Sequence, residues 1–296
     1  MTTSEQTRTQ TLFRKLKRLP KKISAKPDAD NVHELRTTIR RVETLLEVTS
    51  NGTGRKERKL KKQMDRVRRR AGKVRDLDVQ IAALENIKVD SIREERQRVL
   101  QYLRGARAKR ENKLIRALEE EMDGGLEKHL GRTAERVSEN GAGQEISAVK
   151  PDPEAVVARA RETFRDAVER HGALTEQNLH AFRLACKRVR YVAEMAGQNA
   201  EAKRIMTAVK RVQDAIGEWH DWVTLGATAS KVLGTGSSPL LSVIATNTRS
   251  KFLHALRVAD QAKRDLLPEP GAEEYASRAK KPVAGQRGVS RSAATA

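Results

Sequence analysis

Aromatic residues are scarce in this 296-residue chain, at 3% of the total, and cysteine occurs once, at position 186. So few rings are poor material for stacking nucleic-acid bases. One cysteine excludes a disulfide within the chain, which is typical of a reducing cytoplasm. Because Cys186 falls on the apolar side of a predicted helix, we expect it to be a small buried core residue.

Long apolar runs and catalytic motifs are also missing. No run approaches the length of about 18 residues that a membrane span needs, and the N-terminus lacks the apolar core of a signal peptide. The sequence contains no P-loop, G-x-S-x-G elbow, His-rich metal box or Cys/His dyad. We therefore expect a soluble cytoplasmic protein that is not an enzyme and uses neither a cofactor nor a metal ion.

Positive charge is what the sequence has in excess. Lysine and arginine number 60 against 39 acidic residues, which gives a net charge of +21. That excess predicts a polyanionic partner, which could be a nucleic acid, polyphosphate or an anionic membrane surface.

One eleven-residue pattern occurs twice in the chain. Residues 33–43 read HELRTTIRRVE, and residues 180–190 read HAFRLACKRVR. A chain with six histidines does not readily repeat such a pattern by chance, so we interpret it as a duplicated unit. The matched positions are His33 with His180, Arg36 with Arg183, Arg40 with Lys187, Arg41 with Arg188, and Val42 with Val189.

Each copy has two unlike sides when it is placed on a helix, at about 100° per residue. His33, Arg36 and Arg40 share a stripe about 60° wide, and apolar residues cluster nearly opposite. An isolated Lys/Arg stripe is most often a solvated helix face, whereas its recurrence in register favours a binding surface. The predicted core residues are Leu35, Ile39, Val42 and Leu46 in the first copy, and Phe182, Cys186, Val189 and Ala193 in the second.

A second echo follows each copy, with GKVRD at 72–76 and GEWHD at 217–221. The apolar seam before it also recurs: Leu60, Met64 and Val67 match Ile205, Val209 and Val212. We expect the first of these helices to span about 55–72. An aspartate that follows a helix end commonly caps the next helix or pairs with an arginine, so we interpret Asp76 and Asp221 as structural and not as a catalytic pair.

The rest of the chain also has the periodicity of helices. Residues 1–10 are expected to be flexible, and the short apolar stripe that follows them should end at Pro20. Long helices are expected over about 90–122 and 239–267. Asp or Asn near residue 28, Asp152 and Ser238 are suitable N-terminal caps. Residues 124–150 read as a loose connector in which His129 decorates the surface, and 269–296 as a disordered basic tail.

The sequence thus predicts an all-α protein with no strands. We expect two pseudo-twofold-related bundles of about four helices each, with long antiparallel helices, formed by residues 11–123 and 151–268. Two equivalent basic faces brought together would line a positive groove or channel.

The paired H-x-[LF]-R-x-x-x-[RK]-R segments, each followed some forty residues later by G-x-x-x-D, resemble the CHAD domain, the conserved histidine α-helical domain. The resemblance covers nearly the whole chain outside the tail and implies two four-helix bundles whose basic, His-containing surfaces bind inorganic polyphosphate. No E-x-E-x-K signature of the CYTH domain occurs, so a stand-alone member is expected, with association with polyphosphate granules as a further expectation. Glu43 and Val74 depart from the pattern, since the second half has Arg190 and Trp219 at these positions.

Arginine suits a polyphosphate chain because its planar guanidinium grips two oxygens, while lysine supplies an adjustable point charge. Each histidine could donate to phosphate, anchor a helix or ligate metal, and metal ligation is disfavoured because no further ligand stands at i+3 or i+4. A general nucleic-acid binder and a helical scaffold for an acidic partner remain alternatives. The predicted polyphosphate-binding residues are His33, Arg36, Arg40, Arg41, Lys62, Arg66, Arg69, His180, Arg183, Lys187, Arg188, Arg190, Lys210 and Arg211.

Overall fold

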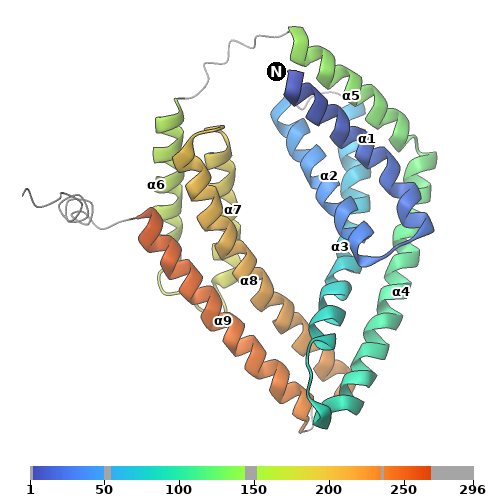
Figure 1. Cartoon of the computed structure of the whole chain (residues 1–296), viewed down its shortest axis with the longest axis vertical. Helices are drawn as coiled ribbons and strands as arrows, with labels where there is room; N and C mark the ends of the chain where they lie inside the picture. The colour runs from blue at the N-terminus through green and yellow to red at the C-terminus, as the bar shows by residue number, and fades with distance from the viewer. Residues whose placement is uncertain (1–2, 50–54, 144–151, 235–236, 268–296) are drawn as a thin grey trace, which may run out of the picture. The chain divides into compact units, whose positions relative to one another are not determined.

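The computed structural model describes residues 3–49, 55–143, 152–234 and 237–267 (Figure 1). All regular structure within these residues is helical, which confirms the all-α prediction. The elements in order are α1 (Thr3–Ala25), α2 (Ala29–Thr49), α3 (Arg55–Glu85), the short 3-10 helix η1 (Asp90–Ile92), α4 (Arg93–Asp123), α5 (Leu126–Gly143), α6 (Pro153–His171), α7 (Leu179–Glu194), α8 (Ala200–Leu233) and α9 (Pro239–Leu266).

The chain divides into two compact units. Unit 1 comprises the described residues within Met1–Val149 and Glu218–Lys251, and unit 2 those within Lys150–Gly217 and Phe252–Ala296. Helices α8 and α9 therefore contribute residues to both units. The predicted tail, 269–296, lies outside the described residues.

The main core of unit 1 is built from helix faces whose apolar spacing the sequence predicted. Leu35, Ile39, Val42 and Leu46 of α2 are each no more than 1% exposed, and the α3 seam from Leu60 to Val74 is equally buried. Burying one such side chain contributes about 1.5–3 kcal/mol, so these two stripes alone fix α2 against α3.

A second apolar cluster in unit 1 explains why Glu218–Lys251 belongs to it. Leu84 of α3 and Leu103 of α4 are fully buried together with Leu225 of α8 and Leu240 of α9. Hydrogen bonds support the same packing, since Glu95 of α4 accepts from the Ser238 hydroxyl at 2.8 Å.

Unit 2 has its own core, in which the predicted stripe of α7 meets α6 and α8. Phe182 and Cys186 are fully buried, and the Phe182 ring lies 6.3 Å from that of Phe164 on α6. From α8, Ile205 and Val209 are buried as well.

Three predicted caps are confirmed. The Asp28 carboxylate accepts a hydrogen bond from the Asn31 amide at 2.8 Å where α2 begins. Asp152 accepts from the amide of Glu154 at 3.2 Å, and the Ser238 hydroxyl accepts from that of Leu241 at 3.1 Å.

Three predicted helix boundaries are wrong. Helix α1 starts at Thr3 and continues through Pro20 to Ala25, because burial of Leu19 and Ile23 offsets the backbone hydrogen bond that proline cannot make. Helix α3 continues past Gly72 to Glu85, since a helical glycine costs only about 1 kcal/mol relative to alanine. The predicted connector contains α5, whose Leu126 and Leu130 pack into the unit 1 core.

Candidate functional site

The first candidate face lies on α2 and α3 in unit 1, and we call it the α2–α3 face. His33 is exposed on α2, and the half-buried Arg36 reaches across to α3, where its Nη1 lies 4.0 Å from Asp76 Oδ1. A second ion pair, between Glu43 and Arg68 at 3.0 Å, joins the same two helices. The basic stripe of α2 therefore lies beside the charged side of α3.

Cations dominate the electrostatics around the first histidine. Partial desolvation lowers the pKa of His33, and the neighbouring cations Arg75 and Arg36 lower it further, against a smaller opposing effect of Asp30. The imidazole therefore loses its proton more readily than that of a free histidine. An anion bound beside it would act in the opposite direction and favour the protonated ring.

Asp76 lies inside α3 and not after a helix end, so its predicted role as a cap is wrong and its predicted pairing with an arginine is confirmed. Desolvation raises the pKa of this carboxyl, while Arg36, His220 and Arg75 lower it. Asp76 is thus a counterion among three basic side chains.

Sequence reasoning left Arg75 and His220 out of the predicted site, although both act on Asp76. Arg75 of α3 is half-buried, and His220 of α8 is exposed. The two residues occupy the same position of the second echo, before Asp76 and Asp221 respectively. That shared position is the signal that could have identified them.

The second candidate face lies on α7 and α8 in unit 2, and we call it the α7–α8 face. His180 and Arg188 are exposed on α7. Arg183 donates from Nε to the carbonyl of Gln213 at 3.0 Å, and its guanidinium covers Gly217, where an added Cβ would stand 3.1 Å from Arg183 Nη2. Glycine at 217 therefore leaves the space that this arginine occupies.

Several predicted cations pair with carboxylates close to them. Arg66 contacts Glu121 of α4 at 2.6 Å, and the Glu121 side chain is only 5% exposed, so this pair ties α3 to α4. Arg69 pairs with Asp65 at 2.7 Å, Arg190 with Glu194 at 3.2 Å, and Lys210 with Asp214. A polyanion must compete with these carboxylates.

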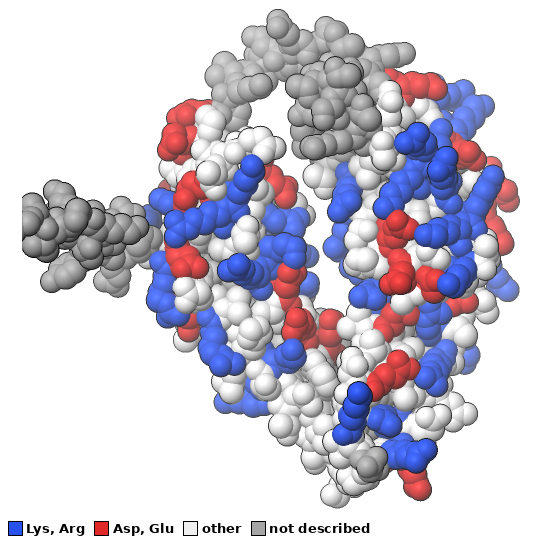
Figure 2. Space-filling model, viewed as in Figure 1, with Lys and Arg blue, Asp and Glu red and all other residues white. Residues whose placement is uncertain are grey.

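Other predicted cations are open to solvent. Arg41, Lys62, Arg188 and Arg211 are exposed and have neither an ion pair nor a side-chain hydrogen bond to any described residue. Figure 2 shows Lys and Arg on the visible surface of each unit, with Asp and Glu beside many of them. Of the predicted set, His33, Arg40, Arg41, Lys62, Arg66, Arg69, His180, Arg188, Lys210 and Arg211 are exposed, and Arg36, Arg183, Lys187 and Arg190 are half-buried.

Cys186 and His129 add no reactive group to these faces. Burial raises the pKa of the Cys186 thiol to about 12, which agrees with its predicted place in the core. His129 is not the surface residue that the sequence predicted, because its Nδ1 lies 2.8 Å from Gln63 Oε1. Within the described ranges, no three His, Cys, Asp or Glu side chains are grouped so that they could hold a metal ion.

The arrangement of helices is similar to that in the crystal structure of the CHAD domain from the plant Ricinus communis. The TM-score is 0.57 at 15% sequence identity, over 88% of this chain and 89% of that chain, and at this identity the likeness shows the fold alone. The sequence profile of the CHAD domain matches residues 8–230. Because this match spans most of the sequence, the chain belongs to the CHAD domain family.

No curated protein matches the chain. In the part of the chain that the structure describes, no helix has both the length and the apolar character needed to cross a membrane.

Proposed function

We propose that this protein binds inorganic polyphosphate through the α2–α3 face and the α7–α8 face, each with an exposed histidine and a row of arginine and lysine. The observation that carries the proposal is the set of exposed cations without a carboxylate partner among the described residues, Arg41, Lys62, Arg188 and Arg211, beside the two histidines. Membership of the CHAD family supports it, since the family resemblance implies polyphosphate binding.

The chemistry of the faces suits a chain of phosphates. Polyphosphate offers many charged oxygens and no bases, so it needs several guanidinium and ammonium donors in a line and little apolar contact. Asp76 neutralises Arg36 at 4.0 Å while no anion is present, and this loose pair costs little to open. We propose binding without catalysis, in the cytoplasm and at polyphosphate granules.

Competition at fixed salt tests the choice of polyanion. Long-chain polyphosphate, double-stranded DNA and single-stranded RNA are compared at equal phosphate concentration, and the dependence of affinity on salt is recorded for each, because phosphate contacts of any kind weaken as salt rises. We expect polyphosphate to displace both nucleic acids. Displacement of polyphosphate by DNA or RNA at comparable concentration would instead support the general nucleic-acid binder.

Binding should weaken as pH rises through neutrality. The pKa of His33 is lowered in the free protein by partial desolvation, Arg75 and Arg36, and a bound polyanion raises it. Affinity is therefore greatest below the free pKa and falls as pH rises through the bound pKa, by about tenfold for each unit between them.

Histidine substitutions assign this pH dependence. We expect His33→Gln to remove part of it and the double change with His180→Gln to remove most of it, in polyphosphate titrations across the pH range. His254→Gln is the matched control, because His254 is an exposed histidine on α9 away from both faces in sequence. A double variant that kept both full affinity and the full pH dependence would refute donation from the histidines.

A further inference from the structure

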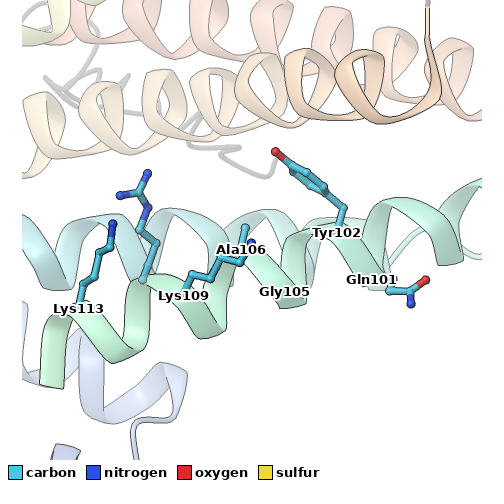
Figure 3. Close-up of a pocket in the computed structure, with 7 residues that line it drawn as sticks. Gln101, Tyr102, Gly105, Ala106, Lys109 and Lys113 are labelled. Atoms are coloured by element: carbon cyan, nitrogen blue, oxygen red, sulfur yellow. The ribbon is translucent and has the colours of Figure 1, made fainter.

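A separate pocket lies on α4 in unit 1, and none of its residues belongs to the two faces described above. It has a volume of about 420 Å³ and is lined by Gln101, Tyr102, Gly105, Ala106, Lys109, Arg110 and Lys113. The side chains of Tyr102 and Lys113 project from the same side of the helix (Figure 3). The lining thus combines one aromatic ring, two small residues and three cations, without a carboxylate.

The three cations of the pocket lack the carboxylate partners that two neighbouring arginines of α4 have. Arg104 pairs with Glu85 at 2.7 Å, and Arg107 is held by Asp78 at 2.6 Å. Lys109, Arg110 and Lys113, by contrast, are exposed and have no ion pair or side-chain hydrogen bond to a described residue. Three exposed cations along one pocket attract an anion, and no carboxylate of a described residue has to be displaced first.

Gly105 forms the floor of the pocket and has no side chain that would fill it. This glycine has helical backbone geometry, and an added Cβ would meet no atom within 4 Å, so neither the backbone nor the packing requires a glycine at this position. A helical glycine nevertheless destabilises a helix relative to alanine. With Ala106 beside it, Gly105 leaves a shallow apolar surface between the ring and the cations.

Tyr102 supplies a π-face at the end of this surface. Tyr102 is 42% exposed. Nζ of Lys231 on α8 lies over the ring, 6.0 Å from the ring centroid. That distance is the outer limit of a cation–π contact, so an aromatic ligand can replace the ammonium without breaking a strong interaction.

We propose that this pocket binds a nucleoside triphosphate. The base stacks on Tyr102, the ribose lies over Gly105 and Ala106, and the phosphates reach Lys109, Arg110 and Lys113. At 1.5 Å per residue, Tyr102 is about 10 Å from Lys109 and about 16 Å from Lys113 along the helix, a span comparable to an extended nucleotide plus the reach of a lysine. One ring matches one base, whereas a single-stranded nucleic acid needs a series of stacking surfaces.

The site does not depend on polyphosphate binding at the other two faces. Inorganic triphosphate shares the anionic part of the ligand and lacks the base, so it isolates the contribution of Tyr102. Inorganic triphosphate is itself a short polyphosphate, so the titration uses the full chain with Arg36, Arg40, Arg183 and Lys187 changed to glutamate. Calorimetry with ATP and with triphosphate, at the same ionic strength, is expected to show about tenfold tighter binding of ATP, as one stacked base provides.

Two substitutions make the assignment specific. Tyr102→Ala should abolish the preference for ATP over triphosphate. Gly105→Leu should weaken ATP binding at least tenfold by covering the floor, and it should not unfold the helix, because leucine is the better helix former and meets open space. Long-chain polyphosphate binding, measured in the same variant, should stay at the wild-type level.

Equal affinity for ATP and triphosphate, or a preference that survives Tyr102→Ala, would overturn the proposal. A short oligoadenylate that displaced ATP at equal nucleotide concentration would replace the mononucleotide site by an RNA site. If the wild-type chain bound ATP but not polyphosphate, the proposed function would fail and the nucleotide site would stand.

Discussion

Reversal of Arg36, Arg40, Arg183 and Lys187 to glutamate is expected to lower the affinity for polyphosphate about a thousandfold. Each change removes one phosphate contact and adds repulsion, at about 1 kcal/mol for a solvent-accessible site. Four such contributions sum to about 4 kcal/mol, which is about three powers of ten in the dissociation constant. The slope of log affinity against log salt should also become shallower, by about 0.7 for each phosphate that the variant no longer neutralises.

The control has the same change in net charge at other positions. Arg14 and Arg18 on α1, and Arg165 and Arg170 on α6, are exposed and lie on helices that carry none of the predicted site residues. Their reversal to glutamate should cost much less than the site variant. Equal reductions in affinity in the two quadruple variants would show that only net charge matters, and intact binding in the site variant would show that both faces are assigned wrongly.

A neutral substitution can test Arg183 without changing charge. Gly217→Leu would displace the Arg183 guanidinium, which lies where the new side chain must go, and should weaken polyphosphate binding about as much as Arg183→Ala. Gly72→Leu is the matched control at the equivalent position of α3, where an added Cβ meets nothing within 4 Å. We expect this control variant to bind normally and to be slightly more stable, because leucine favours the helix.

The core could be predicted from the sequence because its signal is local. The stripes of α2 and α7 repeat at helical spacing, and every residue predicted to be in them is buried. Local signals also gave wrong helix ends, since proline and glycine have low helix propensity and so predict ends at Pro20 and Gly72. Packing of Leu19, Ile23 and Val74 on either side of them outweighs that propensity, and this packing comes from residues distant in sequence.

The site was predicted less completely because no periodicity of the sequence shows which acidic residue pairs with a given cation. A stripe of arginines shows which side of a helix is basic but not which cations are neutralised. Arg66 pairs with Glu121, 55 residues later on another helix, and no local pattern indicates this. Arg75 and His220 are harder to recognise for a different reason, because they are unlike residues at one position of the repeated segment, whereas the aspartates after them are identical.

Replacement of Arg107 by alanine is expected to destabilise unit 1 by about 3–5 kcal/mol, the usual cost of breaking a buried ion pair by removing one partner. Arg107 of α4 donates from Nε to Asp78 of α3 at 2.6 Å and from Nη2 to the carbonyl of Pro27 at 2.6 Å, and it also contacts Glu111. The Asp78 side chain is only 5% exposed; Arg107 bonds its Oδ1, and its buried Oδ2 has no hydrogen-bond partner among the described residues. Without Arg107 a buried carboxylate would be left uncompensated.

Urea unfolding followed by tryptophan fluorescence measures this change in stability, because Trp219 and Trp222 both belong to unit 1. Arg104→Ala on the same helix is the control: its pair with Glu85 is largely exposed and should contribute less than about 1 kcal/mol. Adding Asp78→Asn to Arg107→Ala should recover part of the stability, since it removes the unpaired charge. If the variant at 107 were as stable as the one at 104, this role would be contradicted.

The same arginine links stability to binding, since the carbonyl of Pro27 directly precedes the cap of α2, the helix that carries His33. Arg107 does not belong to the α2–α3 face, so its replacement should change the folded fraction more than the intrinsic affinity. Saturating polyphosphate should then restore stability in proportion to RT ln(1 + [L]/Kd), because the ligand binds the folded form. A decrease in affinity greater than the unfolded fraction accounts for would mean that Arg107 also positions α2 for binding.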